Sequence, residues 1–283
     1  MKKLIEGNGV LYVVATPIGN LEDITIRAIE ILKNIDIIAA EDTRHTLKLL
    51  NHYLIKKPIF SYHEHNKYKV DNKFINLLKE GKKIALVTDA GTPGISDPGE
   101  DIIKKAIDNG IAVVPLPGPT ALITALVISG LKTDKFIFEG FLPTKKSERK
   151  KIFEDLSKER RTIIIYESPH SLRNTLNDIL KFLGNRKISI SREITKLHEE
   201  VIRAEIEYVI DNIEKFKIKG EFVIVIEGSK IKKDENIKFN ILRIEDHYEE
   251  YIKLGYDKKI ALKKVADDRN VSRKEIYNII FKK

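Results

Sequence analysis

Two hydrophobic periods alternate along the first 230 residues of this chain. Short apolar runs of strand length are separated by stretches in which apolar residues recur every three or four positions. This alternation is typical of βαβ units and of a mainly parallel sheet, whose strands are covered by helices on both faces. The sequence therefore predicts an α/β fold.

The first series of elements predicts an N-terminal α/β domain over residues 1–119. The expected strands are 10–15, 36–40, 58–62, 83–88 and 112–116. The expected helices are 25–33, 43–52, 69–79 and 98–109. A domain of this size is ordinary for a globular protein.

A second series predicts a C-terminal α/β domain over residues 120–230. It opens with a small apolar helix at 120–130 and continues with strands, helices and a hairpin or edge segment. The strands are 135–140, 162–167, 187–193 and 221–227, the helices are 148–157 and 169–182, and the edge segment is 196–203. We expect a cleft between the two domains, with ligand-binding loops at the carboxyl ends of the strands.

The chain ends in a helical extension over residues 241–283, after a lysine-rich linker at 228–240. Helices are expected at 257–268 and 272–281, the second opened by a capping box of Ser272 and Glu275. Ile276, Ile279 and Ile280 are expected to form its buried stripe. Two short helices joined by a tight turn resemble a helix-turn-helix, and an ordinary helical hairpin docked on the second domain is the alternative.

Composition argues against disulfides, metal sites and membrane spans. The chain has no cysteine, so we expect no disulfide and no metal site. No apolar stretch approaches the ~18 residues that a membrane span needs, and residues 1–9 are charged, so we expect a cytoplasmic protein without a membrane partner.

Positive charge is concentrated near the end of the chain. The formal net charge is +9, and residues 251–283 hold ten Lys or Arg against four Asp or Glu. Such a surface attracts polyanions and makes a nucleic-acid partner plausible, while solvation by abundant lysine explains the charge equally well.

The most constrained segment is 88–99, TDAGTPGISDPG, which follows a strongly apolar strand. Its three glycines and two prolines fix a winding backbone whose N–H groups can approach a ligand closely. Asp97 is expected to cap the next helix and Pro98 to occupy its first position.

Two other loops share this character, at 15–20 (ATPIGN) and 115–121 (PLPGPTA). All three are expected at the same carboxyl edge of the first sheet. Neither a G-x-G-x-x-G fingerprint after the first strand nor a P-loop motif occurs, which argues against dinucleotide binding and against a P-loop nucleotidase.

Nine segments between residues 13 and 228 together resemble the ribosomal RNA small subunit methyltransferase I family, a branch of the tetrapyrrole methylase superfamily. They are VVATPIGNLEDIT, AAEDTRHT, SYHEHN, DAGTPGISDPG, PLPGPTALITAL, FEGFLP, YESPH, SREITKLHEE and GEFVIVIEG, in the family's order. The terminal helical pair is similar to the helix-turn-helix extension of that family.

The resemblance implies a two-domain class III methyltransferase fold with S-adenosylmethionine in the cleft. It further implies a homodimer and 2'-O-methylation of a cytidine in the decoding region of 16S ribosomal RNA. The acceptor would be the free small-subunit RNA or the assembled 30S subunit.

The resemblance also assigns cofactor contacts residue by residue. Those on the first two loops are Pro17, Ile18, Gly19, Asp89, Gly91, Thr92 and Pro93, and those at the start of the helix that follows the third loop are Thr120 and Ala121. Those in the second domain, expected to close over the adenosine, are Tyr166, Arg192 and Phe222.

Removal of the proton from the ribose 2'-hydroxyl is helped by a positioned base. Four clusters at expected strand ends offer His and carboxylate side chains for this role. The clusters are EDTRH (41–45), HEHN (63–66), ESPH (167–170) and KLHEE (196–200). Glu64 is the nominated base, with His63, Arg44 and Lys196 arranging the ribose and phosphates. Ser168 and Pro169 also have a structural explanation, as the N-cap and first turn of the next helix.

Two other functions remain open at this point. A small-molecule methylase acting on a tetrapyrrole would have the same fold and cofactor, but gives no reason for the basic tail or for the run KKSERKK at 145–151. A nucleic-acid-binding regulator, in which the α/β body senses a ligand, leaves the elaborate loops serving only as a sensor.

Overall fold

The computed structural model describes residues 9–63, 66–230 and 242–281, which form two compact units. The first unit runs to Thr124 and also includes Ile194–Leu197; the second comprises Ala125–Glu193 and the chain from His198 onwards. The expected domain limits at 119/120, 230 and 241 stay predictions. Among the described residues, no helix is long and apolar enough to cross a membrane.

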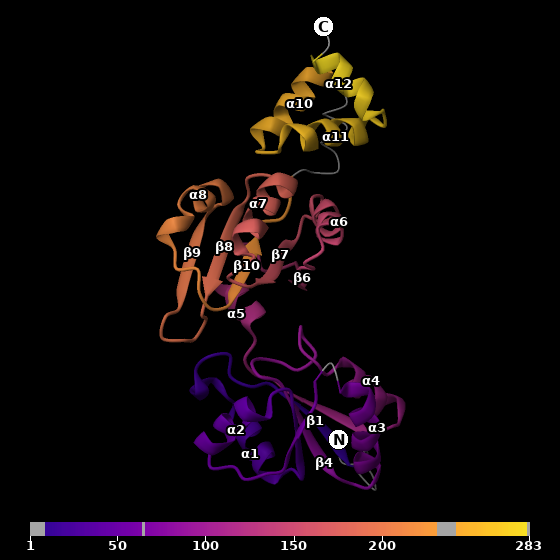
Figure 1. Cartoon of the computed structure of the whole chain (residues 1–283), viewed down its shortest axis with the longest axis vertical. Helices are drawn as coiled ribbons and strands as arrows, with labels where there is room; N and C mark the ends of the chain where they lie inside the picture. Colours follow the sequence, from indigo (N-terminus) through magenta and orange to yellow (C-terminus); the bar gives the residue numbers. More distant parts are fainter. Residues whose placement is uncertain (1–8, 64–65, 231–241, 282–283) are drawn as a thin grey trace. The chain divides into compact units, whose positions relative to one another are not determined.

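The first unit is built on a five-stranded sheet in the order β3-β2-β4-β1-β5, and Figure 1 labels two of its strands, β1 and β4. The strands are β1 (Val10–Val14), β2 (Ile37–Ala40), β3 (Ile59–Ser61), β4 (Lys83–Val87) and β5 (Ala112–Leu116). Every pairing in this sheet is parallel, as the sequence predicts. All five strands therefore end at one edge.

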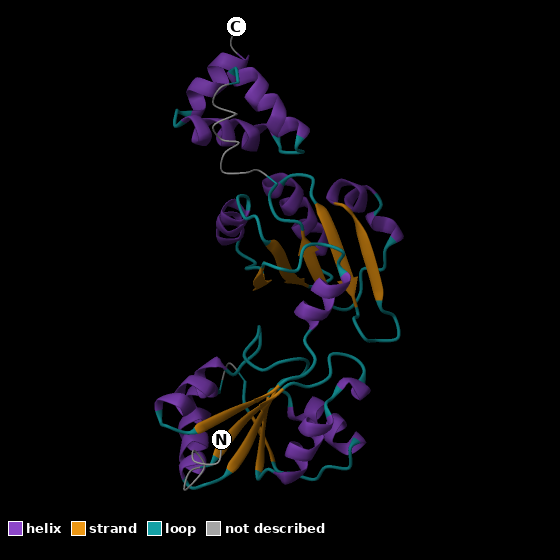
Figure 2. Cartoon of the chain, turned by 180° about the vertical axis from the view of Figure 1, so that it is seen from behind, coloured by secondary structure: helices purple, strands orange, loops and turns teal. Residues whose placement is uncertain are grey.

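Helices cover both faces of this sheet (Figure 2). They are α1 (Ile26–Asn34), α2 (Thr43–His52), α3 (Lys67–Lys79) and α4 (Glu100–Asp108). In β2, Ile38 and Ala40 pack with α1 and α2, whereas Ile37 and Ala39 pack with α3 and α4. Neighbouring side chains point to opposite faces, so a strand buried on both sides needs an uninterrupted apolar run.

The second unit holds a five-stranded sheet in the order β6-β7-β10-β8-β9. Its strands are β6 (Phe136–Phe141), β7 (Thr162–Glu167), β8 (Lys187–Arg192), β9 (Glu200–Glu205) and β10 (Phe222–Ile226). Only β6 and β7 pair in parallel; the β7–β10, β10–β8 and β8–β9 pairs are antiparallel.

The expectation of a mainly parallel arrangement is therefore wrong for this sheet. Helical crossovers do give β6, β7 and β8 the same direction. However, β9 returns from β8 as a hairpin, and β10 inserts in the opposite direction between β7 and β8. The expected edge segment at 196–203 is confirmed in part, because β9 is the edge strand but starts at Glu200.

Three helices of the second unit, α6 (Lys146–Leu156), α7 (Leu172–Leu183) and α8 (Ile206–Asp211), share one core with its sheet. The sequence analysis did not identify α8. Leu172, Leu176, Ile179 and Leu183 form the buried stripe of α7, at the spacing of a helix with one apolar face.

The C-terminal residues form three helices, α10 (Ile244–Lys253), α11 (Lys258–Arg269) and α12 (Arg273–Phe281), around a core of their own. The Ser272 hydroxyl accepts the Glu275 N–H at 3.3 Å, which confirms half of the expected capping box. Ile276 is fully buried, but Ile279 is exposed, so the expected stripe is wrong at that position. Within the second unit, Lys263 of α11 forms an ion pair of 2.7 Å with Glu154 of α6.

Candidate active site

The loops after β1 and β4 are joined at the carboxyl edge of the first sheet. Thr16 and Gly91 exchange two backbone hydrogen bonds, of 2.8 and 3.0 Å. The buried Thr16 hydroxyl donates to the Thr88 carbonyl at 3.0 Å. Gly91 has φ +84°, a conformation in which a side chain is strained. The two loops therefore form one rigid unit, and the glycine is required by its backbone.

The loop after β4 is also linked to the loop after β2. The Thr88 hydroxyl donates to Glu41 Oε2 at 2.7 Å, and the Asp42 N–H donates to Asp89 Oδ1 at 3.0 Å. Asp89, a predicted cofactor contact, thus has one carboxylate oxygen engaged in holding the start of α2.

The loop after β5 joins the same assembly. The Thr92 hydroxyl donates to the Pro119 carbonyl at 3.3 Å. A Cβ on Gly118 would lie 2.8 Å from the Ala15 Cβ, so the first and third loops touch at a position that only glycine fits. Thr120 and Ala121 follow directly, at the start of α5 (Ala121–Ile128). The three loops expected at one edge are thereby brought together.

The helix after the 88–99 loop starts later than expected. Its N-cap is Gly99 and its first residue is Glu100, so the expectation that Asp97 caps it and Pro98 opens it is wrong. Gly99 has φ +148°, and a Cβ there would lie 3.1 Å from the Gly94 nitrogen and from Leu86 Cδ2. The tight packing of this loop against its own strand decides where the helix begins.

The predicted cofactor loop 17–19 contacts the segment Ile194–Leu197, which belongs to the same unit. Pro17 and Ile18 are buried, whereas Gly19 is exposed. A Cβ on Gly19 would lie 2.5 Å from Lys196 Cγ and 2.7 Å from Thr195 Oγ1. This close approach is a structural reason for glycine at position 19, independent of any cofactor.

Carboxylates dominate the charge at this edge. Glu41, Asp42 and Asp89 are joined through the two hydrogen bonds described above. Arg44 binds Asp42 through Nε at 3.2 Å and Nη2 at 2.9 Å, and its own side chain is 88% exposed. The hydrogen bond from Arg44 lowers the pKa of Asp42 to about 2. Asp42 is therefore ionised at neutral pH, while Arg44 can exchange a weak surface partner for an external anion.

The cluster after β3 is only partly described, because the nominated base Glu64 lies outside the described residues. The His63 N–H donates to Asn66 Oδ1 at 2.9 Å, and Asn66 Nδ2 donates to the Ser61 carbonyl at 3.1 Å. Asn66 therefore fixes the backbone on both sides of Tyr62. Burial and nearby Asp71 raise the pKa of the Tyr62 phenol, which keeps it neutral.

In the second unit, Tyr166, Arg192 and Phe222 meet at one edge of the sheet, because Phe222 pairs with Arg192 and Val223 pairs with Tyr166. The Tyr166 ring lies 4.8 Å from that of Phe138, between ring centroids. Phe222 is buried in the core of the unit. Its position at the strand end is as expected, but most of its surface is already covered.

Arg192 is engaged within the second unit. Its Nε lies 3.1 Å from Glu200 Oε2, and its Nη2 donates to the His198 carbonyl at 2.9 Å. Its side chain is only 9% exposed. These contacts hold the end of β8 and the start of β9 together, at the two ends of the segment that connects them.

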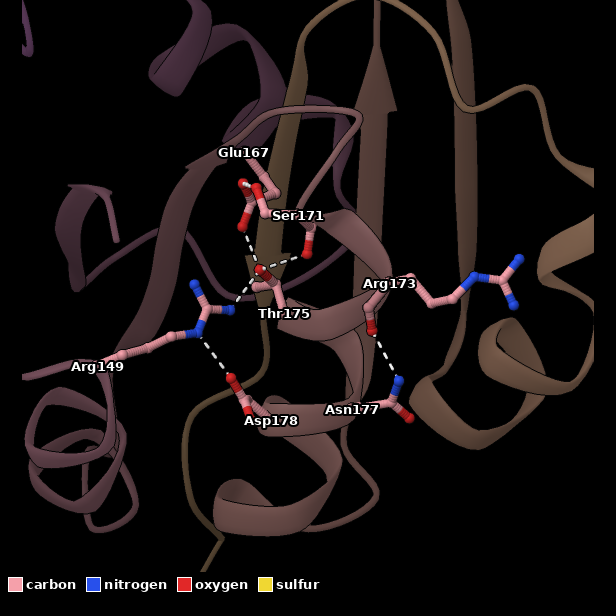
Figure 3. A network of polar contacts seen from close by, with 7 residues as sticks. All are labelled: Arg149, Glu167, Ser171, Arg173, Thr175, Asn177 and Asp178. Carbon is pink, nitrogen blue, oxygen red and sulfur yellow. Dashed lines mark hydrogen bonds and ion pairs between the residues drawn. The ribbon is translucent and has the colours of Figure 1, made fainter. Parts of the chain in front are cut away.

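Glu167, the first residue of the ESPH cluster, has a structural role (Figure 3). The buried Glu167 carboxylate accepts hydrogen bonds from the Ser168 N–H at 2.7 Å and from the Ser171 and Thr175 hydroxyls. Arg149 donates in turn to Thr175 at 2.5 Å. The helix begins at Leu172 with Ser171 as its N-cap, so the expected cap at Ser168 is wrong.

No group of three or more His, Asp or Glu side chains that could hold a metal ion occurs among the described residues.

Comparisons with known proteins identify the family. The tetrapyrrole (corrin/porphyrin) methylase profile matches residues 10–209. Ribosomal RNA small subunit methyltransferase I of Halalkalibacterium halodurans is 50% identical over 275 residues, covering 97% of this chain and 95% of the relative. The protein of that name from Bacillus subtilis is 50% identical over 272 residues, covering 95% and 93%. The chain belongs to the ribosomal RNA small subunit methyltransferase I family of tetrapyrrole methylases.

Solved structures show the same fold at low identity. Uroporphyrin-III-C-methyltransferase of Thermus thermophilus matches with a TM-score of 0.56 and 18% identity, over 77% of this chain and 94% of that one. A complex of that enzyme with S-adenosyl homocysteine gives 0.55 and 16%, over 77% and 97%. Diphthine synthase gives 0.59 and 12%, over 89% and 99%. Membership of this methyltransferase family confirms the predicted fold class and the predicted cofactor, S-adenosylmethionine.

The sequence analysis missed the threonines that bind the loops of this methylase together. Thr16, Thr88 and Thr195 each place a hydroxyl between two loops. Thr88 directly follows a buried strand, and a hydroxyl at that position was the available signal. The partner of Thr195 lies 175 residues away, so no local pattern identifies it.

Proposed function

We propose that the protein methylates the 2'-hydroxyl of a cytidine in the decoding region of 16S ribosomal RNA, with S-adenosylmethionine as donor. One structural observation carries the proposal: three glycine- and proline-rich loops are locked together beside the carboxylates of Glu41, Asp42 and Asp89. The names of the relatives at 50% identity give the acceptor class, ribosomal RNA of the small subunit.

The residues at this edge fit a cationic cofactor with an amino-acid portion. S-adenosylmethionine supplies an electrophilic methyl group on a positively charged sulfur. The carboxylates favour positive charge, and Asp89 has a second carboxylate oxygen besides the one that accepts from the Asp42 N–H. We assign the cofactor to Pro17, Ile18, Gly19, Asp89, Gly91, Thr92, Pro93, Thr120 and Ala121, with contributions from Tyr166 and Phe222.

The other residues are proposed to prepare the acceptor. Alignment of the two reactants in a site without water can account for several kcal/mol of the barrier, up to ~7–11 in favourable cases. Glu64 is the proposed base for the ribose hydroxyl, and His63 lies beside it in the sequence. Arg44, which is 88% exposed, and Lys196 are proposed to hold phosphates.

Basic segments of the second unit are proposed to contact more of the RNA. Lys145, Lys146, Lys150 and Lys151 are exposed at the start of α6, and the C-terminal helices expose further lysines. Contacts of this kind give affinity that falls with salt concentration. The acceptor is free 16S RNA or the assembled 30S subunit, and the working form is proposed to be a homodimer in the cytoplasm.

A methyl-transfer assay tests the proposal directly. Labelled S-adenosylmethionine is supplied with assembled small subunits, with free small-subunit RNA, and with a corrin precursor. We expect label in one of the two RNA samples, at one cytidine whose phosphodiester then resists alkaline cleavage, because cleavage uses the free 2'-hydroxyl. Label in the corrin precursor alone would make the protein a tetrapyrrole methylase, and base methylation would refute the 2'-hydroxyl.

The role of Asp89 is tested with two variants. Asp89→Ala should lower cofactor affinity about 10- to 100-fold, the loss expected for one hydrogen bond to a charged group. Asp89→Asn keeps an oxygen for the Asp42 N–H and removes only the charge. If calorimetry gives wild-type affinity for both variants, Asp89 does not bind the cofactor.

The role of Glu64 is tested by single-turnover transfer. Glu64→Gln should slow transfer by roughly two to four powers of ten, the range for a positioned base, and leave cofactor affinity nearly intact. An unchanged rate would remove Glu64 from the mechanism.

A further inference from the structure

The segment between β8 and β9 is divided between the two units. The chain leaves the second unit after Glu193, contributes Ile194–Leu197 to the first unit, and re-enters the second at His198. Ile194 is buried, whereas Leu197 is 94% exposed. Such a short excursion needs specific contacts to hold it, because four residues bury little apolar surface.

Thr195 supplies one of these contacts. Its hydroxyl oxygen accepts the backbone N–H of Asn20 at 3.0 Å. Its φ is +66°, a left-handed conformation that is rare for a β-branched residue. Strain of this kind persists only where surrounding contacts impose it, and it concentrates at functional sites.

Lys196 lies against Gly19, the residue next to Asn20. Its stem packs on Gly19, where even a Cβ would lie 2.5 Å from Lys196 Cγ. Gly19 and Asn20 end the first of the three locked loops. The stem of Lys196 therefore lies against the end of the candidate cofactor loop, next to the residue that Thr195 binds.

Arg192 and Glu193 hold the ends of the segment within the second unit. Arg192 binds the His198 carbonyl and Glu200. The N–H of Glu221 donates to Glu193 Oε1 at 3.2 Å, and Glu193 also has a positive φ, of +51°. Two left-handed residues thus flank Ile194, and both ends of the excursion are anchored.

We propose that Thr195 is a positioning residue, which holds Lys196 over the loop after β1 so that its ammonium meets a phosphate of the acceptor RNA. This inference rests on the proposed function. It also gives Arg192 a different task from cofactor binding, since its donors close the segment that carries Lys196.

The test is the salt dependence of RNA binding, measured with the acceptor that the transfer assay identifies. Loss of one phosphate contact lowers the slope of log affinity against log salt by roughly 0.7–0.9. Lys196→Met should show this loss. Thr195→Val removes no charge and should nevertheless show it too, while Thr195→Ser should keep the wild-type slope. The double variant Thr195→Val with Lys196→Met should lose no more than Lys196→Met alone.

Thr195→Gly guards against misfolding, because glycine suits the positive φ; it removes the hydroxyl with the rest of the side chain and should behave as Thr195→Val does. Thr133→Val, at an exposed position, is the matched control and should keep the wild-type slope. A wild-type slope in Thr195→Gly, or additive losses in the double variant, would overturn the inference. Absence of RNA methylation by the wild type would instead refute the proposed function.

Discussion

Replacement of Glu167 by glutamine tests whether the ESPH cluster is structural. Three donors converge on the buried carboxylate, and the Thr175 hydroxyl, which accepts from Arg149, also lies 3.1 Å from the Ser171 carbonyl, a second acceptor for its proton (Figure 3). A glutamine amide offers one oxygen and one NH2 group to these donors. With its oxygen in the place of Oε1, the amide keeps the two donors there, but the Thr175 hydroxyl must turn its proton to the Ser171 carbonyl, and the negative charge is lost.

The expected cost follows from these contacts. A hydrogen bond to a charged group contributes about 1 kcal/mol more than one between neutral groups, and three hydrogen bonds lose their charged acceptor. We expect Glu167→Gln to destabilise the second unit by about 3 kcal/mol. For a unit of this size, that corresponds to a fall in Tm of about 6–12 °C.

Thermal unfolding at pH 7, followed by calorimetry, measures this change. Glu148→Gln is the matched control, because Glu148 is exposed on α6 and its ion pair with Lys145 lies on the surface. That substitution should lower Tm by less than about 2 °C. Transfer activity of Glu167→Gln, assayed well below its transition, should remain close to that of the wild type.

Two results would contradict this reasoning. An unchanged Tm would mean that the hydrogen bonds to Glu167 contribute little to stability. A loss of transfer by more than about tenfold in the folded variant would instead place Glu167 in the reaction, because 1.4 kcal/mol of barrier corresponds to that factor.

Two further changes have expected outcomes. Burial lowers the pKa of Lys264 to about 8, below its unfolded value of 10.5, so charging Lys264 costs stability at pH 7 and the cost fades as pH rises from 8 to 10.5. Lys264→Met should therefore raise stability by about 1–3 kcal/mol at pH 7 and by much less at pH 10.5, and an equal gain at both would exclude the charge as the cause. Gly91→Ala forces a side chain to φ +84° and should cost about 1–2 kcal/mol and weaken cofactor binding. Gly110→Ala is the control, because Gly110 has φ +69° and an added Cβ would have no neighbouring atom within 4 Å. It should lower stability by a similar amount and leave cofactor binding unchanged. Equal weakening of cofactor binding by both substitutions would argue against a specific role for Gly91.

Much of the fold was predictable from the sequence because its signals are local. The apolar runs of β1, β2 and β4 are buried between neighbouring strands, β5 is the partly buried edge strand, and the limits of all four lie within a residue or so of the predicted ones. The constrained loops were also visible, since glycine at φ +84° and proline at a loop are requirements of the backbone itself.

The second unit shows what local patterns omit. A strand is apolar whichever way it runs, so the sequence of β10 does not reveal that it lies antiparallel between β7 and β8. The same limit applies to helix starts, where the packing of Gly99 against Gly94 and Leu86 overrode a well-formed capping signal at Asp97.

For the site, the sequence by itself determined which residues can perform the chemistry: the carboxylates, the histidines and the glycine-rich loops. Only the tertiary structure decided how each is used. Glu167 and Arg192 are committed to internal hydrogen bonds, and Thr195 reaches Asn20 across 175 residues of sequence. The reason is physical: a side chain's chemistry is a property of its residue type, but its partners are chosen by long-range packing.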